Sequence, residues 1–329
     1  MVAYAISLKP HAALGRRFLV LRRPPLAPAA EKPFSLAAKM TAGTMSLNIL
    51  KDLKAAYSNL NAAAVRQTAE QHLSIGLVAL TEGAYCAMER FLKPPLEGSV
   101  SARIYRATDP ERPDSFHLVL YDSAVACPEN AFVFYALDQV RTVREILDAR
   151  PELDLPLARN FDVFREPVMD DILHRIANEN ALFSVASALP NVIPTFFELP
   201  WSVGEFATDT AFLTMNQVRM ALLMAGACGD PVGYREQKAQ IGLIIGGAFG
   251  WRAIARELAG KIPLGGGLIP KGAIAYAGTY AVGASLKRYH LHGIKLSLSE
   301  RRETYQAALE RGRKVVGGLI SGLRGHRAA

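Results

Sequence analysis

The chain has 329 residues, of which 50% are hydrophobic and 21% charged, and its mean hydropathy is +0.12. This composition excludes a disordered chain, and the length is sufficient for two domains. Its three cysteines, Cys86, Cys127 and Cys228, form no CxxC pair. They exclude a disulfide-stapled secreted module and a zinc ribbon, and they favour a reducing, cytoplasmic compartment.

The net charge of +8 is concentrated at the two ends of the sequence. Residues 1–44 carry a net charge of +6 and residues 287–329 one of +7, whereas the 242 residues between them carry −5. A basic end can bind an anionic membrane surface or nucleic acid, or can simply be solvated. Nucleic acid is the least favoured of these partners, because the sequence has no RNP motif, zinc finger or interleaved aromatic and basic run.

Residues 1–44 form a basic leader with two Arg pairs and five prolines. No uninterrupted apolar stretch follows Lys9, so the leader is not a secretory signal, and Pro24, Pro25 and Pro28 would break the helix of a transit peptide. We expect either a disordered extension or a true translation start at Met40 or Met45.

Residues 45–165 are predicted to form a small α/β domain. A helix is expected after Asn48, where Leu50, Leu53 and Leu60 recur at helical spacing. The elements predicted next are a short strand from Ile75 to Leu80, a glycine-containing turn, a helix to Leu92, strands at 101–107 and 116–122, and a helix over 129–149.

The strand, glycine turn and helix over residues 74–92 follow the order of elements in a P-loop. Gly76 and Gly83 are present, but no Gly-Lys-Ser/Thr follows, and Asp122 ends a strand where a nucleotide-binding fold places an acidic Mg²⁺ partner. Without the lysine and the hydroxyl, nucleotide hydrolysis has no support. Gly76, Gly83 and Asp122 remain weak candidates for a switch that binds nucleotide through the 76–84 turn without hydrolysing it.

Residues 166–329 are predicted to form a helical domain. The expected helices cover residues 169–190, 213–230, 234–263, 272–293 and 299–320.

Four strings in this half are specific enough to indicate a family: NENALFSVASALPNVIP, LTMNQVRMALLMAGACGD, GAFGWRAIARELAGKIP and KGAIAYAGTYAVG. In this order they resemble the YcjF-like domain of unknown function, over residues of about 166–325. The resemblance implies a bacterial protein with a helical domain of a kind often fused to an Era-like GTPase, and some members lie in the inner membrane. It therefore implies that residues 45–165 are a pseudo-GTPase domain, or that a GTPase partner is a separate chain. It transfers no catalytic residue.

Two stripes of small residues recur every four positions in the helical half. The uncharged runs around them, 241–251 and 272–286, are shorter than the roughly 20 residues of a membrane span, although whether the second run inserts in a bilayer stays open. Small stripes let helices approach closely, in membranes and in soluble hairpins alike. The predicted helix-packing residues are Gly242, Gly246, Gly250, Ala275, Thr279 and Gly283.

The last predicted helix, 299–320, is basic and amphipathic. It opens with Ser299 and Glu300, and Tyr305, Leu309 and Val316 line one side. Such a helix either lies in an anionic membrane interface or caps the bundle with a solvated basic face. The predicted membrane or partner surface consists of Arg301, Arg302, Arg311, Arg313 and Lys314.

The sequence therefore predicts a mostly α protein, a helical domain preceded by a small α/β domain. We expect a non-enzymatic interaction or membrane-surface module without cofactor, metal or catalytic residues. Its expected partners are an anionic membrane surface at the cytoplasmic side of the inner membrane and a GTPase or other protein, and a homo-oligomer stays open. The alternative is the non-hydrolysing nucleotide switch.

Overall fold

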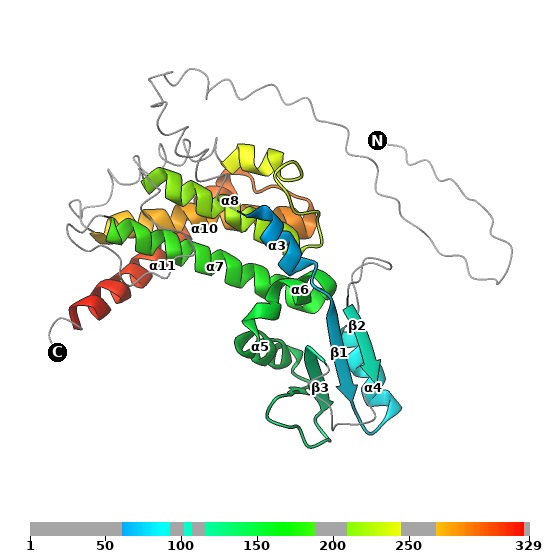
Figure 1. Ribbon diagram of the computed structural model, residues 1–329. Coiled ribbons are helices and arrows are strands. Elements are labelled where there is room, and N and C mark those ends of the chain that lie inside the picture. Colours follow the sequence, from blue (N-terminus) through cyan, green and yellow to red (C-terminus); the bar gives the residue numbers. More distant parts are fainter. Residues whose placement is uncertain (1–60, 93–101, 107–115, 188–208, 245–267, 326–329) are drawn as a thin grey trace. The chain divides into compact units, whose positions relative to one another are not determined.

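The computed structural model describes residues 61–92, 102–106, 116–187, 209–244 and 268–325. All of them belong to one compact unit of the chain, Thr44–Ala329. Helix is the main secondary structure among these residues, and a small parallel sheet precedes the long helices (Figure 1). The predicted fold class, mostly helical with a small α/β part first, is confirmed.

The sheet has four short strands in the spatial order β2-β1-β3-β4. Their bounds are β1 (Leu73–Val78), β2 (Ala102–Arg106), β3 (Leu118–Asp122) and β4 (Phe132–Phe134). Neighbouring strands are parallel, and the arrowheads of β1, β2 and β3 point the same way in Figure 1. Because β1 lies between two strands and is covered on both faces, its sequence is an almost continuous apolar run.

Helices cover one face of this sheet. They are α4 (Glu82–Phe91), α5 (Gln139–Ala149) and, after the 3₁₀ turn η2 (Pro151–Leu153), α6 (Asp154–Asn160). Their apolar side chains pack with those of the strands in one core, which includes Leu73, Ile75, Leu77, Met88, Leu118, Leu120, Phe134, Ile146 and Leu157. The opposite face of the sheet buries Val78, Val119 and Tyr121 under Phe116 and the non-helical segment 123–131.

Long helices form the second half. Their bounds are α7 (Asp162–Ala186), α8 (Asp209–Ala227), α10 (Leu268–His292) and α11 (Leu298–Gly325). Helices α7, α8 and α10 contact one another, α11 packs on α10 and α7, and the short α3 (Ala62–Ala69) packs on α8 and α6.

Helix α7 connects the two halves. Its residue Phe164 belongs to the core beneath the sheet, Ile172 and Ile176 to the core shared with α8, and Ala181 and Val185 to the core shared with α10 and α11. The predicted boundary between residues 165 and 166 falls inside this helix, so the chain passes from one half to the other without a linker.

The structure differs from the sequence prediction over 129–149. A strand, β4, occupies the first part of this range, because Phe132, Val133 and Phe134 pair with β3, and the helix begins only at Gln139. The side chain of Asp138 sets this start by accepting a hydrogen bond from the backbone N–H of Arg141.

Three other predicted helices lie partly outside the described residues, and of the one over 169–190 only residues 188–190 do. Of the helix expected over 234–263, the structure describes residues 238–244 as helical, whereas Gly246 and Gly250 lie beyond the described part. The helical spacing of Leu50, Leu53 and Leu60 also lies outside it.

Candidate functional site

The carboxyl edge of the sheet is the first candidate site. Open parallel sheets bind ligands at this edge, at the point where the strand order reverses. Here that point lies between β1 and β3, because β2 is added on one side of β1 and β3 on the other. Asp122 is the last residue of β3 and Gly83 lies in the first turn of α4, so both are at this edge.

Gly76 is not part of the edge. It lies in the middle of β1, opposite Tyr105 of β2 and Val119 of β3. A Cβ atom at Gly76 would be 3.0 Å from Cδ2 of Phe116, so the glycine leaves room for that ring. The predicted 76–84 turn is accordingly much shorter, since only residues 79–81 join β1 to α4. Three residues are too few for the loop of backbone N–H groups that surrounds a phosphate in a P-loop.

The N-terminus of α4 is already capped by the protein itself. The hydroxyl of Thr81 accepts a hydrogen bond from the backbone N–H of Ala84 at 3.2 Å, and Glu82 places a carboxylate in the first turn. A negative charge in the first turn disfavours an anionic ligand at this helix N-terminus.

Arg106, at the end of β2, is neutralised by α4. Its guanidinium forms ion pairs with Glu82 at 2.9 Å and with Glu89 at 2.6 Å, and it lies 5.1 Å from the ring centroid of Tyr85. The hydrogen bond from Arg106 lowers the pKa of Glu89. One arginine between two carboxylates leaves a net negative charge here, which disfavours a phosphate.

The carboxyl edge instead exposes apolar side chains. Leu80 after β1 is 74% exposed, Val140 in the first turn of α5 is 66% exposed, and Leu137 after β4 is fully exposed. We call these three residues the apolar edge. They follow strands that lie two strand spacings apart, about 10 Å.

The backbone beneath the apolar edge is held in place. The hydroxyl of Thr142, which is fully buried, accepts a hydrogen bond from the backbone N–H of Tyr135 at 2.9 Å. The guanidinium of Arg141 lies 4.0 Å from the ring centroid of Tyr135. Leu137 therefore projects from an ordered turn between β4 and α5.

A buried polar cluster joins α7, α8 and α10, and we call it the polar seam: Asn180, Asn216, Gln217 and Thr279. The amide nitrogen of Asn180 donates to the hydroxyl of Thr279 at 2.7 Å, and its amide oxygen accepts from the amide of Asn216 at 2.9 Å. Gln217 donates to the same hydroxyl at 3.4 Å. All four residues are buried. Such a network favours one arrangement of the helices, because any shift leaves buried polar groups unpaired.

Three of the four strings singled out in the sequence meet at the polar seam. They contribute Asn180, Asn216 with Gln217, and Thr279. One turn away from Thr279, a Cβ atom at Gly283 would lie 2.9 Å from both Cγ of Leu173 and Sδ of Met220. The spacing of small residues in the sequence predicted Thr279 and Gly283 as packing positions, but it did not predict the other members of the seam. The available signal was an asparagine, Asn180, within the apolar stripe of α7.

The C-terminus of α8 is capped by arginines from neighbouring helices. Arg159 of α6 donates to the carbonyl of Asp230 at 3.2 Å, and Arg165 of α7 donates to that of Ala227 at 3.3 Å. Gly229 adopts φ +79°, the left-handed conformation that ends many helices. The carboxylate of Asp230 then accepts a hydrogen bond from Nδ1 of His290 on α10 at 2.8 Å, and the imidazole is fully buried. The arrangement ties α6, α7 and α10 to one helix end.

The basic residues of α11 do not form one surface. Arg301 donates to the carbonyl of Leu296, Arg313 pairs with Glu310 at 2.7 Å, and Arg311 contacts His174 of α7 at 3.0 Å and lies over the ring of Tyr280 of α10. Arg302 and Lys314 are exposed. The apolar side of α11 is occupied as well, because Tyr305, Leu309 and Val316 are buried against α10 and α7.

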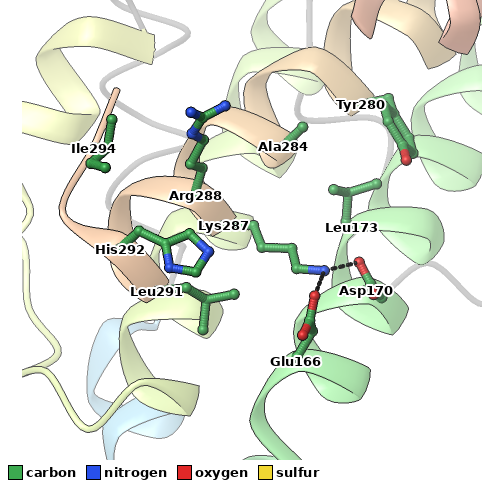
Figure 2. Close-up of a pocket in the computed structure, with 10 residues that line it drawn as sticks. All are labelled: Glu166, Asp170, Leu173, Tyr280, Ala284, Lys287, Arg288, Leu291, His292 and Ile294. Atoms are coloured by element: carbon green, nitrogen blue, oxygen red, sulfur yellow. Dashed lines mark hydrogen bonds and ion pairs between the residues drawn. The ribbon is translucent and has the colours of Figure 1, made fainter. Parts of the chain in front are cut away.

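An open cleft of about 460 Å³ lies between α7 and α10. Figure 2 shows Lys287 extending from α10 to two carboxylates of α7, Glu166 at 2.9 Å and Asp170 at 2.7 Å. The hydrogen bond from Lys287 lowers the pKa of Glu166. Arg288 beside it pairs with Glu300 of α11 at 2.7 Å. The charges in this cleft thus pair with one another and hold helices together.

The two predicted stripes have different surroundings. Ala275, Thr279 and Gly283 are buried on α10, whereas Gly242 is exposed and has no atom within 4 Å of an added Cβ. The rest of the first stripe, Gly246 and Gly250, lies outside the described residues.

No described helix combines the length and the apolar composition needed to cross a bilayer. Within the described ranges, no three His, Cys, Asp or Glu side chains come together as a metal site would require. Comparisons with protein-family models, curated proteins and solved structures find no match to this chain.

Proposed function

We propose that this protein is a non-enzymatic interaction module of YcjF-like type, and that its apolar edge binds a basic protein partner. One observation carries the proposal: Leu80, Leu137 and Val140 are exposed on ordered backbone at the edge where open α/β sheets bind ligands. Large apolar side chains that gather at a surface are typical of protein-binding sites.

The charge of the edge favours a basic partner. Asp122, at the end of β3, and Asp138, at the start of α5, accompany the two carboxylates that surround Arg106. Residues 45–286 as a whole carry a net charge of −5. Complementary charge steers a basic surface toward such a site and selects it over acidic ones. The resemblance supplies a candidate class of partner, an Era-like GTPase carried on a separate chain.

The nucleotide switch is the weaker proposal. A phosphate at the start of α4 would meet Glu82 and an N–H group already bonded to Thr81, and the connection from β1 is three residues long. The same edge therefore suits a protein surface better than a nucleotide.

Site-specific photo-crosslinking of the full chain in its own cells tests the proposal. A photoreactive residue at Leu137 should give an adduct with a net basic protein, and Leu80→Lys in the same chain should remove it, because the added positive charge repels a basic surface. The matched control is the same photoreactive residue at Arg90, which is exposed in the last turn of α4. Equal adducts at both positions, or none at Leu137, would contradict the proposal. A crosslink within a single chain, with no second protein in the product, would instead assign the edge to the chain's own basic leader.

Titration of the full chain with fluorescent GTP and ATP analogues separates the two proposals. We expect no saturable binding. Micromolar binding that Gly83→Trp abolishes would favour the switch, because Gly83 lies in the first turn of α4 and an added Cβ there meets nothing within 4 Å.

A further inference from the structure

The turn between α10 and α11 carries a second group of exposed apolar side chains. Ile294 is 54% and Leu298 68% exposed, and Tyr289 in the last turn of α10 is also exposed. Leu296, between the two aliphatic residues, is buried and anchors the turn to the bundle. Leu298 follows Ile294 by four positions, so their Cα atoms lie at most about 14 Å apart.

The turn is ordered by capping interactions at both helices. Gly293 ends α10 with φ +71°, and its N–H donates to the carbonyl of Tyr289 at 2.7 Å. Ser297 and Glu300 form a reciprocal capping box at the start of α11. Arg288 pairs with the same Glu300, and these hydrogen bonds from Ser297 and Arg288 lower the pKa of Glu300 to about 2. The exposed aliphatic residues therefore project from a preformed structure.

Positive charge surrounds these aliphatic residues. Lys295 and Arg302 are exposed, and neither has an ion-pair partner in the part of the chain that the structure describes. Arg301 donates to the carbonyl of Leu296, which leaves its charge uncompensated. Glu303, in the second turn of α11, is an exposed acidic residue. The turn thus combines aliphatic tips with an excess of cations.

We infer that the α10–α11 turn binds an anionic lipid bilayer. Ile294 and Leu298 enter the boundary between headgroups and acyl chains, while Lys295, Arg301 and Arg302 remain at the level of the lipid phosphates. An acidic bilayer has an apolar layer that suits the aliphatic side chains of this turn. Above that layer, its negatively charged headgroups suit the turn's cations. The site shares Arg301 and Arg302 with the surface predicted on α11, but its apolar residues come from the turn, because the apolar side of α11 is buried in the bundle. It is also independent of the protein-binding role of the apolar edge.

Co-sedimentation of the full chain with vesicles tests the inference. We expect binding to vesicles of phosphatidylcholine with phosphatidylglycerol and none to phosphatidylcholine alone. Lys295→Ala with Arg302→Ala should weaken binding about 30-fold, from about fivefold for each basic residue near the surface. Ile294→Ser with Leu298→Ser should weaken it at least about tenfold, because the apolar contribution is lost.

Two matched controls use exposed side chains of the same kinds elsewhere. Leu80→Ser with Leu137→Ser removes two exposed leucines from the apolar edge, and Arg90→Ala with Arg144→Ala removes two exposed arginines from α4 and α5. Both should bind as the unaltered chain does. Binding that the turn variants leave unchanged would overturn the inference and point to the basic leader, and so would equal binding to both kinds of vesicle.

A second measurement reports on the turn directly. In a Leu298→Trp chain, the emission in excess of the unaltered chain should shift to the blue on anionic vesicles and stay constant on phosphatidylcholine vesicles. An absence of any shift would overturn the inference even if the chain sediments. If no vesicle binds the chain, a protein partner at this turn replaces the bilayer.

Discussion

The apolar edge exposes apolar side chains, whereas the polar seam buries polar ones. Each departs from the usual distribution, in which apolar side chains are buried and polar ones exposed. At the edge, Leu80 and Leu137 face solvent on a backbone held by helix caps; in the seam, Asn180 and Asn216 are buried and hydrogen-bonded to other helices. An exposed leucine gains nothing within the folded chain, so its role is outward. A buried asparagine stabilises only if its partners stay in place, so its role is internal. Recognition of a protein partner is therefore expected at the sheet, whereas the interior of the bundle fixes the arrangement of its helices.

The largest expected effect tests the seam. Asn180→Ala removes the donor to Thr279 and the acceptor of Asn216, and leaves both groups buried without this partner. We expect a loss of about 3 kcal/mol in the free energy of unfolding, measured by urea denaturation of the full chain. Asn178→Ala is the matched control, since this asparagine is exposed on the same helix. Equal losses in the two variants would remove the seam's structural role.

A second test compares one glycine from each of the two stripes of small residues. Gly283→Leu drives a side chain into Leu173 and Met220, and we expect a loss of about 2–3 kcal/mol from overpacking, seen as a lower Tm. Gly242→Leu places the same side chain in open space and should change stability by less than about 0.5 kcal/mol. A similar drop in both variants would mean that Gly242 is packed as closely as Gly283.

Asp154, the first residue of α6, differs from both the apolar edge and the polar seam, because it is a partly buried carboxyl without a full set of partners. It allows a test of the cost of burying a charge. Its Oδ1 atom is buried without a hydrogen bond, and burial, helped by the nearby Asp171, raises the pKa of its carboxyl from 3.8 to about 7. Because the pKa is higher in the folded state than in the unfolded state, protonation of this carboxyl favours folding. This contribution to the free energy of unfolding is fully present below the unfolded pKa and is lost as the pH rises through about 7.

Asp154→Asn should therefore be nearly neutral at pH 4 and stabilising by about 1–2 kcal/mol above pH 7. Denaturation midpoints measured across this range check the effect. A gain that is the same at pH 4 and pH 8 would exclude the carboxyl as its source. Asp171→Asn, at an exposed position on α7, should give a smaller change.

The smallest expected effect concerns the apolar edge. Leu80→Ser and Leu137→Ser should each change the free energy of unfolding by less than about 0.5 kcal/mol, because neither side chain is buried. Leu80→Ser should also remove the adduct from the chain that carries the photoreactive residue at Leu137. A marked loss of stability would show that these leucines pack within the chain and would weaken the contrast with the seam.

Local signals in the sequence were sufficient for much of the fold. Short apolar runs, followed by segments in which apolar residues recur at helical spacing, predicted β1, α4, β2 and β3. The spacing of Ala275, Thr279 and Gly283 predicted a stripe of small residues that is buried in the structure.

Non-local contacts explain most of what the sequence analysis missed. Gly76 resembles a turn residue, but it is a glycine because the ring of Phe116, forty residues away, packs on it. The strand β4 is only three residues long, and its pairing with β3 decides its conformation. The seam was missed because the partners of Asn180 come from two other helices.

The capped end of α8 has a consequence for how the chain unfolds. Arg159 and Arg165 come from helices that carry the sheet's core, yet their guanidinium groups satisfy carbonyls at the end of a bundle helix. Helix α7 is shared by the cores of both halves. Together with α7, these hydrogen bonds make the stability of each half depend on the folding of the other. The described residues should therefore melt in one cooperative transition, with a calorimetric enthalpy equal to the van't Hoff enthalpy.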